Sequence, residues 1–347
     1  MPQRTIDPPR SEAELDDLLT TPTESTVAAV SRLDGDLMLL GAGGKMGPSL
    51  AALAKRSLEA AGLPHRVICV SRFGSGDVAP RLREQGIETI SCDLLDRSCY
   101  AELPDAPNIV YLAGFKFGAS AAPHRTWAMN AYLPALVAER FTDARIVALS
   151  TGNVYPQVPV ESGGATESTE PAPVGEYAQS CLARERMFEY MAEAHGTRSV
   201  LVRLNYATDL RYGVLLDIAG RVQAGTPVDV TMGWLNTIWQ GDANAVLLSA
   251  FALCDSPPDV LNLTGPETLS VRETAHEFAR LLDRPEPDVA GNEAELALLS
   301  NASRCHALFG PPRIDEQTLI EWTASWVAGA QPTLGKPTHF ETRDGRF

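Results

Sequence analysis

An apolar segment at residues 37–41 runs directly into three glycines with the spacing Gly41-x-x-Gly44-x-x-Gly47. This spacing suits the pyrophosphate of a dinucleotide, because the first glycine permits a tight turn after a strand and the second lets the backbone approach the phosphates. The third lets the next helix pack on the sheet with its N-terminus toward the anion. A helix predicted over 48–61 and a second apolar strand over 66–70 complete a βαβ unit, so the sequence predicts a nucleotide-binding sheet.

Apolar strands and helices alternate along the first half of the chain. We expect strands at 37–41, 66–70, 87–91, 108–112 and 145–149, and helices at 48–61, 77–85, 97–102 and 123–140. This alternation predicts an α/β fold, a Rossmann-type doubly wound parallel sheet that binds its ligand at the carboxyl ends of the strands. A long polar loop over 156–175, typical of a functional or mobile segment, precedes a helix over 176–194 and a strand over 199–203.

The pattern divides the chain into four parts. We expect an N-terminal helical extension (1–35), a Rossmann dinucleotide-binding domain (36–203), a smaller mixed α/β substrate lobe that shares elements with it (204–330) and a C-terminal tail (331–347). In the extension, one helix is predicted over 11–19 and a second is expected to be capped by Ser25 or Thr26.

Composition narrows the expected partners to small molecules. The net charge is −15 and no basic run occurs, so neither nucleic acid nor an anionic membrane is expected as a partner. A cytoplasmic location is expected, because the N-terminus lacks the apolar core of a signal peptide and no window approaches about 18 apolar residues. The scattered histidines predict no metal site. Without a CxxC pair, the cysteines are interpreted as reduced core residues; they are Cys69, Cys92, Cys99, Cys181, Cys254 and Cys305.

Further motifs follow the glycine loop in order. They are Ser91-Cys92-Asp93-Leu94, Tyr111-Leu112-Ala113-Gly114, a helical Asn130, Ser150-Thr151-Gly152-Asn153-Val154-Tyr155 and, later, Trp239-Gln240-Gly241-Asp242 and Leu261-Asn262-Leu263-Thr264-Gly265. Together these segments resemble the extended short-chain dehydrogenase/reductases, the NAD(P)-dependent epimerase/dehydratase family, over about residues 36–330. The resemblance implies a homodimer formed through the helices at about 123–140 and 177–194.

The resemblance also implies where a nicotinamide dinucleotide binds. The expected contacts are Gly41, Gly44, Lys45, Met46, Gly47, Ser71, Arg72, Asp93, Leu94, Ala113, Gly114, Asn130 and Cys181. At the end of the second strand, Ser71 takes the position where NAD-preferring members carry an acid, and Arg72 follows at once. Loss of the acid together with gain of a cation favours NADP, with NAD as the alternative.

The largest departure from the family concerns its Tyr-x-x-x-Lys pair. There the lysine binds the nicotinamide ribose and lowers the pKa of the tyrosine that exchanges a proton with the substrate oxygen. Here Tyr177 is followed by Cys181, and a neutral thiol cannot supply that charge. We interpret Cys181 as a small buried filler rather than a nucleophile.

Another lysine is the best candidate for the missing charge. Lys116 lies in the loop after the strand at 108–112, which should face the substrate. The resemblance implies that Thr151 bonds the reacting oxygen and that Tyr177 exchanges the proton, so the expected catalytic residues are Thr151, Tyr177 and Lys116. Lys55 and Lys336 are expected to be solvated.

The chemistry implied is hydride transfer at a carbinol or carbonyl carbon. Gly152-Asn153 replace the Asp-Glu pair of sugar-nucleotide 4,6-dehydratases, so dehydration of that type is not expected. Net oxidation or reduction, epimerisation and isomerisation of a sugar, polyol or hydroxy acid stay open. The alternative is a catalytically silent NADP-binding sensor or scaffold. Expected substrate contacts are Phe115, Asn153, Asn205, Tyr206, Arg211, Trp234 and Asn236.

Overall fold

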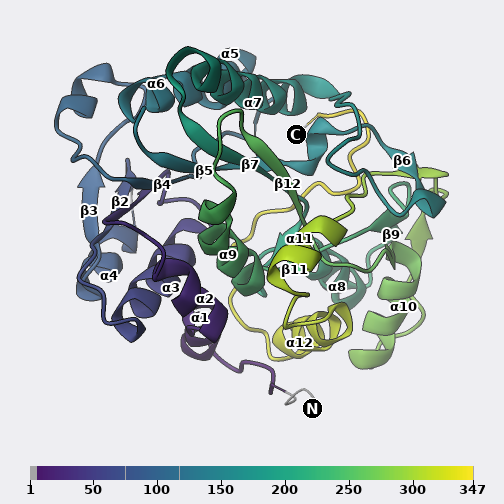
Figure 1. Cartoon of the computed structure of the whole chain (residues 1–347). Helices are drawn as coiled ribbons and strands as arrows, with labels where there is room; N and C mark the ends of the chain where they lie inside the picture. Colours follow the sequence, from purple (N-terminus) through teal and green to yellow (C-terminus); the bar gives the residue numbers. More distant parts are fainter. Residues whose placement is uncertain (1–5, 75, 117, 347) are drawn as a thin grey trace.

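A seven-stranded parallel sheet forms the centre of the computed structural model, which describes residues 6–74, 76–116 and 118–346 (Figure 1). The strand order is β12-β7-β5-β4-β1-β2-β3. The chain adds β2 and β3 on one side of β1 and then β4, β5, β7 and β12 on the other, so the order of addition switches between β1 and β4, as in a doubly wound fold. The predicted Rossmann-type sheet is therefore confirmed. The strands are β1 (Leu37–Leu40), β2 (Val67–Ser71), β3 (Glu88–Ser91), β4 (Asn108–Tyr111), β5 (Arg145–Thr151), β7 (Arg198–Leu204) and β12 (Asp259–Leu263).

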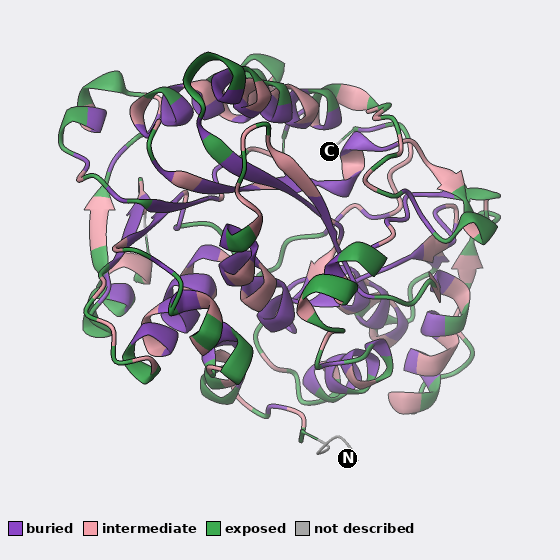
Figure 2. Ribbon diagram, in the orientation of Figure 1, coloured by how far each residue is buried: buried purple, intermediate pink, exposed green. Residues whose placement is uncertain are grey.

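Helices cover both faces of this sheet, and the middle strands are buried on both sides (Figure 2). In β1, Leu37 and Leu39 face one core and Met38 and Leu40 face the other, because successive side chains of a strand point to opposite faces. The first face carries α3 (Gly47–Ala60), α4 (Val78–Glu84) and α9 (Gln240–Ser249), with α1 (Glu12–Thr20) and α2 (Glu24–Val30) packed outside. The second carries α5 (Pro123–Trp127), the π-helical turn η2 (Ala128–Tyr132), α6 (Leu133–Arg140) and α7 (Gly175–His195).

A third core lies away from the central sheet and joins three further helices. It is built on α8 (Val214–Ala224), α10 (Val271–Leu281) and α12 (Glu316–Ala328), and it also receives Leu15 and Leu19 of α1 and Phe340 of the C-terminal segment. Short strand pairs complete this part: β8 (Ala207–Thr208) with β11 (Ile238–Trp239), β9 (Val228–Asp229) with β14 (Val289–Ala290), β10 (Trp234–Leu235) with β13 (Leu269–Ser270), and β6 (Val158–Pro159) with β15 (Leu296–Ala297). The other short helices are α11 (Ser303–Phe309) and the 3₁₀ turns η1 (Arg97–Ala101), η3 (Gly152–Val154), η4 (Val160–Ser162) and η5 (Ala250–Leu253).

Two local predictions are wrong. Helix α2 is capped by Thr23 instead of Ser25 or Thr26: the Thr23 hydroxyl accepts from the Thr26 amide at 3.2 Å, and the Thr26 hydroxyl accepts from the Thr23 amide at 2.8 Å.

The cysteines are also not all reduced. The turn η1 returns the chain so that Cys92 and Cys99, with Cα atoms 6.2 Å apart, form a disulfide. Cys69, Cys181, Cys254 and Cys305 are free thiols.

The described residues contain no helix with the length and apolar character needed to span a bilayer. Nor do they gather three or more His, Cys, Asp or Glu side chains in an arrangement that could hold a metal ion.

Candidate active site

A cavity of about 1150 Å³ opens at the carboxyl ends of the strands. Its lining comes from the loops after β1, β4, β5 and β7, from the start of α7 and from the segment around Tyr212. The C-terminal segment closes one side, because Leu334 donates its amide to the Arg211 carbonyl at 2.9 Å and Thr338 donates its amide to Asp217 at 2.7 Å. The volume exceeds the roughly 300–1,000 Å³ of a typical small-ligand pocket, so the cavity is large enough for an extended ligand.

The glycine loop forms the floor beneath the first turn of α3. Gly41 has φ +87°, and a Cβ there would lie 2.6 Å from the Ala113 amide nitrogen, so the turn requires glycine. Its amide donates to the Val70 carbonyl at 2.8 Å. A Cβ on Gly47 would collide with the Ala42 carbonyl, which explains how α3 approaches the sheet so closely.

All four lysines of this acidic chain line the cavity: Lys45, Lys55, Lys116 and Lys336. Lys336 is exposed and Lys55 is partly exposed, so lining the cavity does not contradict the expected solvation of these two lysines. Lys55 is paired with Glu59 at 3.0 Å on α3. Cations collected in one place within a chain of net charge −15 indicate an anionic ligand.

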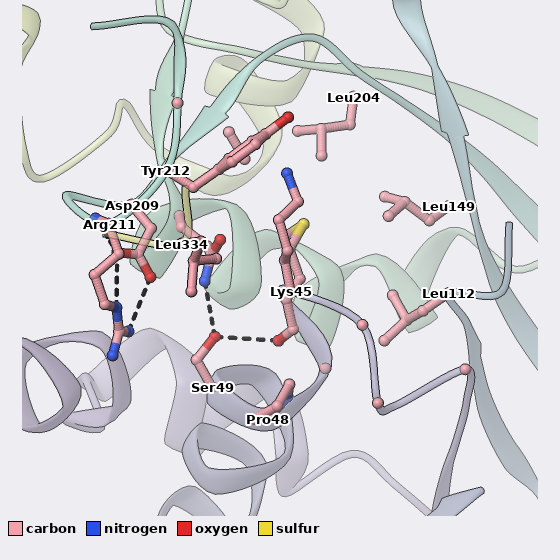
Figure 3. A pocket seen from close by; sticks show the side chains of 18 of the residues that line it. Lys45, Pro48, Ser49, Leu112, Leu149, Leu204, Asp209, Arg211, Tyr212 and Leu334 are labelled. Atoms are coloured by element: carbon pink, nitrogen blue, oxygen red, sulfur yellow. Dashed lines mark hydrogen bonds and ion pairs between the residues drawn. The ribbon is translucent and has the colours of Figure 1, made fainter. Parts of the chain in front are cut away.

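Lys45 belongs to the exposed glycine loop, but its ammonium reaches into the cavity (Figure 3). The Nζ atom lies 2.8 Å from the centroid of the Tyr212 ring. Burial, with the nearby positive charges of Lys116 and Lys336, lowers the pKa of Lys45 to about 7, although Asp209 and Asp217 oppose the shift.

Thr151 and Tyr177 meet at the wall formed by β5 and α7. The Thr151 hydroxyl oxygen accepts from the Asn153 amide at 3.2 Å and from Asn153 Nδ2 at 3.1 Å. Burial and the neighbouring Cys181 raise the pKa of Tyr177, while the Arg184 charge and a hydrogen bond with Thr151 act in the opposite direction. Lys116 Nζ lies 5.7 Å from the centroid of the Tyr177 ring, and burial lowers the pKa of Lys116 to about 8.

An apolar strip borders the polar wall. Leu112, Leu149 and Leu204 stand side by side after β4, within β5 and at the end of β7, across the cavity from Asp209 and Arg211 (Figure 3). The cavity thus combines a phosphate-type loop, an apolar strip and a hydroxyl pair.

Many of the predicted site residues line this cavity. They are Gly41, Gly44, Lys45, Met46, Gly47, Gly114, Phe115, Lys116, Thr151, Asn153, Tyr177, Asn205, Tyr206 and Arg211. Arg211 is already engaged, since it is paired with Asp16 at 2.8 Å and with Asp209 at 2.9 Å.

The others lie outside the lining: Ser71, Arg72, Asp93, Leu94, Ala113, Asn130, Cys181, Trp234 and Asn236. Asn236 is buried behind it, where it accepts from Asn205 Nδ2 at 2.7 Å and donates to the Ser300 carbonyl at 2.6 Å. Trp234 pairs with Ser270 between β10 and β13. Ser71 still lies near the glycine loop, because a Cβ on Gly43 would approach its hydroxyl to 2.6 Å.

Sequence reasoning missed Arg184, which lines the cavity from α7, and Asp16, which reaches it from the N-terminal extension. Tyr212, which the sequence suggested together with Arg211 as a substrate contact, lies against Lys45. Only Arg184 carried a local signal, because it follows Tyr177 by seven residues and so shares its helix face.

Comparisons with known proteins agree with this geometry. The sequence model of the NAD dependent epimerase/dehydratase family matches residues 37–207. No curated protein matches the chain in sequence.

Solved structures of low sequence identity share the fold. UDP-glucose 4-epimerase from Thermotoga maritima, in a structure with UDP-glucose, is 16% identical with a TM-score of 0.70, covering 85% of this chain and 99% of its own. The UDP-glucose 4-epimerase of Thermus thermophilus in complex with NAD is 20% identical with a TM-score of 0.68, over 85% and 99%. The dTDP-glucose 4,6-dehydratase of Bacillus anthracis with NAD is 14% identical with a TM-score of 0.71, over 84% and 96%. Through residues 37–207, the chain belongs to the NAD dependent epimerase/dehydratase family.

Proposed function

We propose that the protein is an enzyme that transfers hydride between a nicotinamide dinucleotide and a carbinol or carbonyl carbon of a small polar substrate. The substrate class is a sugar, polyol or hydroxy acid, and the outcome is net redox chemistry, epimerisation or isomerisation. One observation carries the proposal: the Thr151 and Tyr177 hydroxyls meet on the wall of the cavity that contains the glycine loop. A module that only bound nucleotide would not need that pair.

The residues present fit a dinucleotide. Gly41 and Gly47 leave no room for side chains at the turn before α3, and the N-terminus of that helix favours an anion. Lys45 adds a cation to the same loop. Arg72 is exposed directly after β2, which supports NADP over NAD. When bound, such a cofactor gives hydride to a substrate carbon or takes it from one.

The protein residues handle the proton and the oxygen. Because Asn153 donates to Thr151, the Thr151 hydroxyl directs its own proton elsewhere, toward Tyr177 or a substrate oxygen. As a carbonyl carbon gains hydride, the Tyr177 hydroxyl gives its proton to the oxygen, and oxidation of a carbinol runs the same transfer backward. Lys116 stabilises negative charge on either oxygen from the loop after β4.

Dehydration of the 4,6 type is not part of the proposal, because Gly152 and Asn153 replace the acidic pair beside Thr151. The competing function, a silent NADP-binding sensor, is favoured by the uncharged Cys181 and by the raised pKa of Tyr177.

Activity separates the two functions. The full-length protein is incubated with NADP⁺ or NADPH and a panel of sugar nucleotides, free sugars and hydroxy acids, followed by absorbance at 340 nm and by NMR of the products. Tyr177→Phe and Lys116→Met should each lower turnover by about 10²–10⁴-fold, whereas Cys181→Ser should be mild. Tight NADPH binding without turnover across the panel would support the sensor. An inactive Cys181→Ser beside an active Lys116→Met would show that the thiol carries the chemistry.

A further inference from the structure

Arg184 is a buried cation with only neutral hydrogen-bond acceptors. The residue is 6% exposed and lines the cavity. Its guanidinium donates to the Leu149 carbonyl at 2.6 Å and to Asn130 Oδ1 at 3.0 Å. Its Nε–H is buried, and none of the described residues accepts a hydrogen bond from it. A buried charge held this way is costly, so it requires a reason.

The adjacent acid does not form an ion pair with Arg184. Glu185 accepts from Arg203 Nε at 3.0 Å and Nη2 at 2.6 Å, and from the Ser150 hydroxyl at 2.6 Å. That carboxylate is saturated by other donors. Across the described part of the chain, no carboxylate comes within salt-bridge distance of Arg184. Its charge is therefore available to the cavity, which is typical of a functional site.

Arg184 shares a helix face with the residues of the altered pair. Tyr177, Cys181 and Arg184 follow one another at i, i+4 and i+7 on α7. Burial raises the pKa of Cys181 and of Tyr177, and Arg184 opposes the shift in both. The guanidinium field thus reaches both side chains. Lys116 acts from the opposite loop, where its ammonium contacts the Thr338 carbonyl at 3.5 Å.

The loop after β4 is shaped around this guanidinium. A Cβ on Gly114 would lie 2.8 Å from Arg184 Nη2, so a larger residue would displace the guanidinium. Asn130 fixes both sides, since its Oδ1 accepts from Arg184 and also from the Phe115 amide at 2.8 Å. The Arg184 guanidinium is therefore held against the Tyr111-Leu112-Ala113-Gly114 segment, which by its resemblance to the family lines the nicotinamide ribose.

We propose that Arg184 replaces the lysine missing at position 181, binding the ribose hydroxyls of the nicotinamide nucleotide and holding a fixed positive charge beside Tyr177. This inference rests on the proposed function, because it needs a nicotinamide dinucleotide in the cavity. A guanidinium stays protonated across the physiological range and offers several donors in one plane. The charge beside Tyr177 therefore does not vary with pH.

The test compares NADPH dissociation constants of full-length variants by fluorescence titration, with thermal melts to verify folding. Arg184→Gln keeps a donor for the Leu149 carbonyl but removes the charge, and should weaken NADPH binding about 10–100-fold. The double variant Cys181→Lys/Arg184→Gln restores a cation one turn earlier on the helix. It should bind NADPH at least about tenfold more tightly than Arg184→Gln does. A purely structural Arg184 would not be rescued by a lysine at another position.

Two results would overturn the inference while leaving the proposed function standing: wild-type affinity in a folded Arg184→Gln, or a double variant no better than Arg184→Gln. If Arg184→Gln does not fold, Cys181→Lys alone decides. With Arg184 present, the new lysine meets a like charge and should lower the melting temperature without improving affinity. If Cys181→Lys instead binds NADPH about tenfold more tightly than wild type, Arg184 does not take over the role of the family's lysine, and the inference is overturned. A wild-type protein that binds neither NADPH nor NADH would refute the proposed function itself.

Discussion

Dinucleotide binding should weaken steeply between pH 7 and pH 9, because Lys45 must carry its proton to contact a phosphate. With a pKa of about 7, about one half of the Lys45 side chains are charged at pH 7 and about one hundredth at pH 9. The sign follows from the linkage, because a bound anion raises the pKa of Lys45 in the complex. The contribution of Lys45 to affinity is therefore fully present below pH 7 and is lost as the pH rises toward the pKa of Lys45 in the complex.

The charge fractions alone give about a 50-fold loss of affinity over these two pH units. Lys45 belongs to an exposed loop, so solvent screening reduces this effect, and we expect about 10- to 50-fold. Calorimetry in buffers of different ionisation enthalpy should show proton uptake on binding. The 2′-phosphate of NADP does not interfere, because phosphate groups of this kind are already ionised above about pH 7.

Two variants isolate the effect. Lys45→Met should bind NADP weakly at pH 7 and show little further change up to pH 9. Lys55→Met is the matched control, because Lys55 lines the same cavity but is paired with Glu59 at 3.0 Å; it should keep the wild-type slope. A wild-type affinity that is flat from pH 7 to pH 9, or an equally steep Lys45→Met, would refute the reasoning.

Two further predictions concern the cofactor and the assembly. Arg72→Ala should reduce the preference for NADPH over NADH about 10–100-fold, the value of a charge-assisted contact with the 2′-phosphate. The control variant Arg81→Ala should leave this preference unchanged. Equal wild-type affinity for both nucleotides would contradict the assignment of Arg72. Light scattering should report a homodimer at micromolar concentration, and a monomeric wild type would contradict this prediction. Tyr190→Glu should dissociate the dimer, because Tyr190 on α7 is 60% exposed on the expected interface.

The sheet could be predicted from local pattern because each strand is a short apolar run bounded by turn residues. The expected strand at 145–149 extends in the structure to Thr151, since Ser150 and Thr151 pair in register with Arg203 and Leu204 of β7. That extension depends on a partner strand about fifty residues away, which the local pattern does not contain. It also places Thr151 at the edge of the cavity.

Features that depend on distant segments were out of reach. The polar loop over 156–175 contains β6, whose partner β15 lies far along the chain, so its own sequence shows no strand pattern. Lys336 is exposed, as expected of a lysine in a tail, but the local sequence does not show that it borders the cavity. It does so because Thr338 is hydrogen-bonded to Asp217 of α8, which fixes the C-terminal segment there. In the same way, only the turn η1 reveals that Cys92 and Cys99 meet.

The exchange of lysine for cysteine at position 181 is best understood together with Arg184. Sequence spacing put both on the Tyr177 face of α7, but it could not show that Glu185 is saturated by Arg203 and that Arg184 is left without a carboxylate. A lysine beside that guanidinium would place two cations on one buried helix face, where Coulomb repulsion is weakly screened. Cysteine at 181 removes the repulsion, and arginine at 184 retains a positive charge near the tyrosine. The effects of Cys181→Lys and Arg184→Gln on NADPH affinity should therefore be strongly non-additive in a double-mutant cycle, as expected for side chains that share one role.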